Sequence, residues 1–159
     1  MKSRSTLIAA LVAAALSGPA QADGDRMPPI KNPEVAKECS ACHMLYPAGL
    51  LPARSWTRIM GDLKNHFGDN AELDPALTQR ITAYLTQNAD GAGRPPSKVS
   101  RDLAATEAPL RITELPWWKR KHEKKDRVSP AALKEYKAKF LGDCVACHKQ
   151  AEKGVFEDD

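Results

Sequence analysis

The stretch GDCVACHKQ, residues 142–150, repeats the pattern of KECSACHML, residues 37–45. Each stretch contains one C-x-x-C-H motif, formed by Cys39, Cys42 and His43 in the first and by Cys144, Cys147 and His148 in the second. The two motifs use all 4 cysteines of the 159-residue chain. Because Cys and His are both rare here, two chance matches that leave no cysteine over are not credible.

Covalent attachment of c-type haem explains all six motif residues at once. Two thiols three residues apart can add to the two vinyl groups of one haem, and the following histidine can then bind the iron. Two disulfides would need neither this spacing nor the histidines, and a thioredoxin-like pair belongs near a βαβ pattern that this chain lacks. A structural zinc site would usually have its C-x-x-C pairs closer together and would leave the histidines without a role. We therefore expect two covalently attached haem c groups.

The sixth ligand of each iron is the open question. The chain has 4 histidines, and the two outside the motifs, His66 and His122, lie one in each half. Methionine is the competing ligand, but no methionine follows Met60, and Met44 adjoins His43 on the wrong side of the ring. Met60 is a rival to His66 for the first haem, although we expect it in the core. We expect bis-histidine coordination at both irons. The simplest assignment pairs His43 with His66 and His148 with His122, and a crossed arrangement stays open.

Two histidine ligands on each iron would favour electron transfer over catalysis. A second histidine in place of methionine lowers the reduction potential, and a saturated iron does not readily bind small molecules. The sequence therefore predicts a low-potential electron shuttle and no enzyme. One alternative is a dihaem enzyme, a peroxidase or a small-molecule reductase, with one open iron. Another is a fixed electron-transfer subunit of a larger oxidoreductase.

Residues 1–22 have the features of a cleaved signal peptide: two basic residues, a short apolar run and a small-residue cleavage site at Ala20 to Ala22. The run is too short to span a bilayer comfortably, so we expect an exported, periplasmic protein that is not an integral membrane protein. The formal charge falls from +4 to +2 without the leader, because the leader has two basic and no acidic residues. Nothing in this composition favours binding to nucleic acid.

The remaining pattern is mostly α. Helices are expected to start at Asn32-Pro33, Asp74-Pro75 and Ser129-Pro130, where a capping side chain precedes proline. We expect the first to run through His43 and the last to carry one apolar face from Leu133 as far as Cys147. A further apolar stripe runs from Trp56 to Phe67 and includes Ile59, Met60, Leu63 and His66. The expected domains are a first haem domain over 23–90, a linker over 91–109 and a second haem domain over 110–159.

The run WWKRKHEKKDR, residues 117–127, is strongly basic and contains His122. A solvated basic segment is its commoner meaning. Its functional interpretation is a docking surface for an acidic redox partner. Trp117 and Trp118 are candidates to shield the edge of a porphyrin.

The stretches YPAGLLPARSW, LKNHFGDNAELD and APLRITELPWW, with the two haem motifs, resemble the bacterial dihaem cytochrome c family. Members of that family are periplasmic electron carriers, and one is the reductant of an oxygen-binding monohaem cytochrome, the Sphaeroides haem protein. The resemblance implies a class I cytochrome c-like N-terminal domain, a small, irregular haem-binding C-terminal domain and bis-histidine ligation at both haems. It implies an oxygen-binding monohaem cytochrome or a membrane-bound quinol-linked cytochrome as redox partner. The ligand positions carried over by matching motif are His43, His66, His122 and His148.

Overall fold

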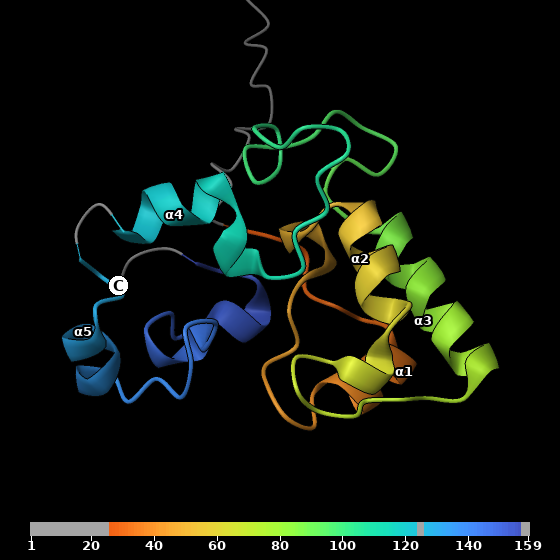
Figure 1. The fold of residues 1–159 in the computed structure, drawn as a ribbon, viewed down its shortest axis with the longest axis horizontal. Coiled ribbons are helices and arrows are strands. Elements are labelled where there is room, and N and C mark those ends of the chain that lie inside the picture. The colour runs from red at the N-terminus through yellow and green to blue at the C-terminus, as the bar shows by residue number, and fades with distance from the viewer. Residues whose placement is uncertain (1–25, 124–125, 157–159) are drawn as a thin grey trace, which may run out of the picture.

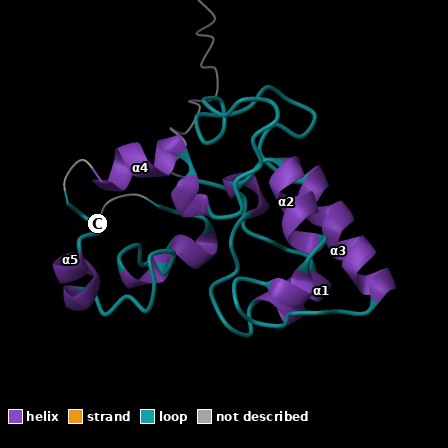
Figure 2. Cartoon of the chain, in the orientation of Figure 1, coloured by secondary structure: helices purple, strands orange, loops and turns teal. Residues whose placement is uncertain are grey.

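The computed structural model describes residues 26–123 and 126–156, so the expected leader over 1–22 lies outside the described residues. Within these ranges every regular element is a helix, and the rest is loop with isolated bridges (Figure 2). The mostly α prediction is confirmed. The α-helices are α1 (Pro33–Cys39), α2 (Ala53–Met60), α3 (Pro75–Gln87), α4 (Pro116–His122) and α5 (Pro130–Glu135). Short 3-10 turns cover Ala48–Leu50, Leu63–Asn65, Ile112–Glu114, Cys144–Ala146 and Ala151–Lys153.

The helices are arranged in two groups (Figure 1). One group holds α1, α2 and α3, with α3 packed against α2 and α1. The other holds α4, α5 and the C-terminal segment, and the long loop between α3 and α4 runs along one edge of both. Within the described residues, no helix combines the length and the apolar character needed to cross a membrane.

Three helices start where the sequence predicts. The Asn32 side chain accepts hydrogen bonds from the backbone N–H groups of Glu34 and Val35 at 2.9 and 3.1 Å. The Asp74 and Ser129 side chains cap α3 and α5 in the same way, and each is followed by proline at the first helical position. Such caps satisfy backbone donors that the helix itself leaves without partners.

The first helix ends earlier than expected. The prediction of a helix from Pro33 through His43 is wrong, because α1 stops at Cys39. The Ser40 hydroxyl and the Ser40 N–H both donate to the Ala36 carbonyl, at 2.6 and 3.3 Å. A side chain that bonds to the backbone in this way competes with helix continuation, so Cys42 and His43 lie on a turn.

The last helix also ends early. The prediction of one helical face from Leu133 to Cys147 is wrong, since α5 ends at Glu135. Lys137 adopts a left-handed φ of 54°, and the Ala138 N–H donates to the Leu133 carbonyl at 2.9 Å. These are the features of a Schellman motif, which normally has glycine in the left-handed position. The chain beyond it is therefore released from the helix, and Tyr136 and Phe140 are exposed.

The expected apolar stripe from Trp56 to Phe67 is correct only in its first half. Trp56 and Met60 are buried in the core, so Met60 has the core position expected of it. The helix ends at Met60, with Gly61 as its cap. Phe67 has a φ of 55° in a turn and is 43% exposed, so its place on a buried face is contradicted.

The buried apolar residues form a cluster that joins both halves of the chain. Val35 and Ile81 come from the first half, and Leu115 and Trp118 come from the second. The segment over 91–109, expected as a linker, has no helix but contributes the buried Val99 to this cluster. The division into a first domain, a linker and a second domain stays a prediction.

The described N-terminal segment pairs with the C-terminal one. The Met27 N–H donates to the Gly154 carbonyl at 2.7 Å, and Arg26 forms an antiparallel bridge with Val155. Gly154 has a φ of 76°, and a Cβ atom there would collide with the Met27 carbonyl oxygen. The position therefore requires glycine for its conformation and for its close approach to a neighbouring backbone.

We expect Gly154→Ala to lower the free energy of unfolding by more than the about 1–2 kcal/mol that left-handed backbone alone costs a residue with a Cβ. The matched control is Gly93→Ala, which has a φ of 66° but nothing within 4 Å of the added Cβ. Guanidinium unfolding followed by circular dichroism measures both. Equal losses in the two variants would contradict the close packing of Gly154 on Met27.

Candidate functional site

The first motif histidine follows α1 on a turn and is oriented by its neighbour. Nδ1 of His43 donates to the Met44 carbonyl at 2.7 Å, because a carbonyl can only accept. The proton is thus fixed on Nδ1, and Nε2 keeps a lone pair for a metal. The ring of Tyr46 lies against the His43 ring, with a centroid distance of 4.9 Å.

His66 faces this histidine from a tight turn. Its N–H donates to the Asp69 carbonyl at 2.8 Å, and the Asp69 N–H donates back to the His66 carbonyl at 3.1 Å. Between them Phe67 and Gly68 both have positive φ, as in the two-residue turns of hairpins. The rings of His43 and His66 are 6.2 Å apart between centroids, at an interplanar angle of 27°.

The surroundings of His66 favour the neutral imidazole that a metal binds. Burial lowers the pKa of His66, and the nearby His43 lowers it further, while Asp69 acts in the opposite direction. A buried group resists charge because the protein interior solvates it poorly. His66 is therefore neutral at physiological pH.

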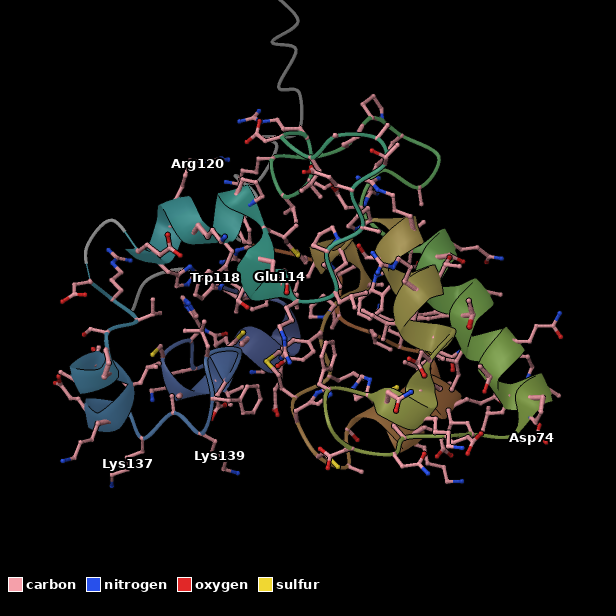
Figure 3. All side chains as sticks on the ribbon, viewed as in Figure 1. Asp74, Glu114, Trp118, Arg120, Lys137 and Lys139 are labelled. Atoms are coloured by element: carbon pink, nitrogen blue, oxygen red, sulfur yellow. The ribbon has the colours of Figure 1, made fainter. Side chains whose placement is uncertain are left out.

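The second pair is built at the end of α4. Nδ1 of His122 donates to the Trp118 carbonyl at 2.9 Å, and the two side chains stack with centroids 4.3 Å apart at 13°. The Trp118 side chain lies on the inner side of α4, towards the segment that holds the second motif (Figure 3). The His122 and His148 rings are 6.0 Å apart between centroids and nearly perpendicular, at 85°. The chain thus has a second histidine pair with its own orienting contacts.

This second pair and Cys144 line a partly open cavity of about 630 Å³, a volume that includes space open to solvent. Burial raises the pKa of the Cys144 thiol to about 11 and also raises the pKa of Cys147. The other side chains that line the cavity are Leu50, Ile112, Trp117, Trp118, Lys121, Arg127 and Phe156. Most of this lining is apolar or aromatic, as expected for a cofactor site.

The first pair borders a more open groove of about 1080 Å³, a volume that includes space open to solvent. Cys42 and His43 line it from the first motif, and Phe140 and Val145 line it from the second half. Burial and the adjacent Glu38 raise the pKa of Cys39, so this thiol is protonated at neutral pH. Across the described residues, no three His, Cys, Asp or Glu side chains gather as a metal site.

The separation of the two rings in each pair fits a haem iron between them. Metal–imidazole bonds of about 2 Å on opposite sides of one ion would hold two ring centroids about 6 Å apart. Both pairs have this separation. Phe67, beside His66, and Phe140, in the groove with His43, are 43% and 45% exposed. A flat apolar macrocycle would give such side chains something to cover them.

The structure brings His43 next to His66 and His148 next to His122, which is the straight arrangement rather than the crossed one. Their identity as iron ligands stays a prediction at this point.

Sequence reasoning missed several contacts between side chains of the site. Phe156 lies 5.9 Å from His148 between ring centroids, and nothing in its sequence position indicates this. Trp118 precedes His122 by one helical turn, so the spacing did contain a signal for their contact. Tyr46 has a contact that no local pattern reveals. Its hydroxyl donates to the Gly142 carbonyl at 2.8 Å, next to the second motif.

Tyr46 therefore joins the two sites. Its ring contacts His43 of the first motif, and its hydroxyl holds the backbone two residues before Cys144. Burial raises the pKa of Tyr46, and Cys144 and Asp143 raise it further, so the phenol stays protonated and can donate.

Comparison with known proteins gives one family and several solved structures. The family model described as dihaem cytochrome c matches residues 35–156. A diheme cytochrome c from Rhodobacter sphaeroides is 49% identical, over 80% of this chain and 98% of that chain, with a TM-score of 0.72. A structure of DHC purified from Rhodobacter sphaeroides is 48% identical over 80% of this chain and 99% of that chain, with a TM-score of 0.65. The diheme cytochrome type c of Shewanella baltica OS155 is 41% identical over 79% of this chain and 87% of that chain, with a TM-score of 0.61. The comparison with curated proteins gives no significant match.

We expect Tyr46→Phe to lower the free energy of unfolding by about 1 kcal/mol, because it removes one partly buried hydrogen bond and keeps the ring. Tyr136→Phe is the control, since the Tyr136 side chain is 51% exposed. Guanidinium unfolding of both purified variants measures the difference. A loss no larger than that of the control would mean that the Gly142 contact does not hold the two sites together.

Proposed function

This chain belongs to the dihaem cytochrome c family, and we propose that it transfers electrons through two bis-histidine haems. The family carries two covalently bound haem c groups with iron. In the proposal the first haem is attached to Cys39 and Cys42 and the second to Cys144 and Cys147. The proposed iron ligands are His43 with His66 and His148 with His122.

The observation that carries this proposal is that the four histidines form two pairs. Each half of the chain supplies a motif histidine and a second histidine at the separation that one iron requires. Hydrogen bonds to carbonyls fix Nδ1 of His43 and His122 as protonated, which leaves Nε2 as the metal-binding atom. A site with both axial positions filled has no vacancy for an exogenous ligand.

Haem supplies one-electron chemistry at its iron, and the protein sets the potential through the axial ligands and their surroundings. Histidine in both axial positions gives a lower potential than histidine with methionine. Met60 lies in the core, which supports its exclusion as a ligand. We infer a low-potential shuttle that performs no bond chemistry.

The proposed working place is the periplasm. The support is the leader-like sequence over 1–22 and the covalent attachment of the cofactor, which prevents its loss outside the cytoplasm. As a cytochrome the protein exchanges electrons with redox partners. The proposed ones are an oxygen-binding monohaem cytochrome and a membrane-bound quinol-linked cytochrome.

Carbon monoxide tests the ligation. We expect the fully reduced wild-type protein to show no change of its visible spectrum on exposure to carbon monoxide, because both irons are saturated. His66→Ala and His122→Ala should each let carbon monoxide bind to half of the total haem. Met60→Leu is the control, and its spectrum should remain that of the wild type. Binding of carbon monoxide at one haem of the wild-type protein would contradict the proposed electron shuttle with two saturated irons. It would favour a dihaem enzyme with one open iron.

Electron paramagnetic resonance tests the pairing through ring orientation. Nearly parallel imidazole planes on a ferric haem give a rhombic low-spin signal, whereas nearly perpendicular planes give a signal with one large g value. The angles of 27° and 85° therefore predict one signal of each kind in frozen ferric protein. His122→Ala should remove the large-g signal, and His66→Ala should remove the rhombic one. Two signals of the same kind, or loss of the wrong one, would contradict the pairing.

A further inference from the structure

Three residues that line the cavity around His122 and His148 carry polar groups that iron ligation does not use. Trp117 carries an indole N–H, Lys121 an ammonium and Arg127 a guanidinium. We propose that these three groups bind the two propionate carboxylates of the second haem. The proposal rests on the proposed function, since it requires a haem in this cavity.

Trp117 provides the first reason. Its side chain is 7% exposed, and its Nε1 is buried with no hydrogen-bond partner among the described residues. The indole N–H can only donate, and leaving a buried donor without an acceptor costs about 1–3 kcal/mol. Trp56 is also buried but does not line this cavity, and its indole N–H donates to the Ala48 carbonyl at 2.8 Å. Within the described part of the chain, the fold thus supplies an acceptor for Trp56 and none for Trp117, whose side chain lines the cavity.

The two cations provide the second reason. Lys121 adjoins His122 on α4, and the Arg127 N–H donates to the His122 carbonyl at 3.2 Å, so both belong to the backbone that positions this histidine. Among the described residues that line the cavity there is no Asp or Glu, and apart from the cations, two histidines and a cysteine they are apolar or aromatic. Haem carries two carboxylates, which are acceptors for an indole N–H and for cations alike. Arginine in particular binds a carboxylate with two parallel hydrogen bonds.

Arg120, a neighbour on α4, shows that the cations of this helix do not all line the cavity. Arg120 extends from the outer side of α4, away from Trp118 (Figure 3), and pairs with Asp102 at 2.5 Å. Arg120 does not line the cavity. It therefore serves as a charge control next to Lys121 in the sequence.

The binding of propionates by these groups has a measurable consequence at the iron. Positive charge and hydrogen-bond donors near a haem oppose the extra positive charge of the ferric form, so they raise its reduction potential. Arg127→Gln and Lys121→Gln should lower the midpoint potential of the second haem. At the midpoint potential that the second haem has in the wild type, each of these variants should have a ratio of oxidised to reduced second haem about threefold higher than the wild type. Trp117→Phe should shift it less, in the same direction.

The experiment is a spectroelectrochemical titration of the haem-loaded proteins, with the resonance Raman propionate bending band as a second readout. Trp117→Phe removes the N–H and keeps an aromatic ring, so we expect this band of one haem to move to lower wavenumber. Trp56→Phe and Arg120→Gln are the matched controls, and they should leave the band and the second haem's potential as in the wild type. If Trp117→Phe does not accumulate, Arg127→Gln and Lys121→Gln still test the proposal, because both substitutions are at exposed residues.

Unchanged potentials and an unchanged propionate band in Trp117→Phe and Arg127→Gln would overturn the proposal. So would equal shifts in Arg120→Gln and Arg127→Gln, because the effect would then be that of general charge. Failure of the underlying function looks different. A wild-type protein with an open second iron would bind carbon monoxide, whatever the state of the propionates.

Discussion

The separation of about 6 Å between two imidazole rings is the constraint that the local structure at both sites serves. An iron can accept two histidines only if both rings present a bare nitrogen to the same point. In the proposed ligation the protein meets this demand in different ways. A neighbouring carbonyl holds His43, a turn with positive φ presents His66, and stacking on Trp118 aligns His122. α1 ends at Cys39 and α5 ends at Glu135, so His43 and His148 both lie outside these helices.

The two sites depend on each other because each is completed by the opposite half of the chain. Leu50, from the first half, lines the cavity of the second pair, and Phe140 lines the groove of the first. Tyr46 contacts His43 and bonds to the Gly142 carbonyl. A shared core and shared walls make separate unfolding of the halves costly, since either half alone would expose apolar surface that the other covers. Burial of two porphyrins would add to this coupling.

Local chemistry decided how much of this could be predicted. The sequence predicts the motifs and the proline-capped helix starts well, because each is a local pattern of adjacent residues. It also predicts the two remaining histidines as candidate ligands, because the chain has only 4 histidines. Helix ends were harder to predict. The stop of α5 uses a Schellman turn with Lys137 where glycine is usual, and the stop of α1 depends on one serine hydroxyl. Contacts between distant segments, such as Tyr46 with Gly142, leave no periodic signal, and no single-sequence pattern could have revealed them.

Two copies of the same covalent motif do not produce two equivalent redox centres. The second pair lies in a cavity lined by tryptophans and by the cations Lys121 and Arg127. The first lies by a wider groove with Lys139, Asp143 and Glu152 on its walls. Solvent access, hydrogen bonding and nearby charge all tune a haem at constant ligation. Ring planes at 27° in one pair and 85° in the other add a further difference. Unequal surroundings imply unequal potentials, and unequal potentials give an electron a preferred resting site within the molecule.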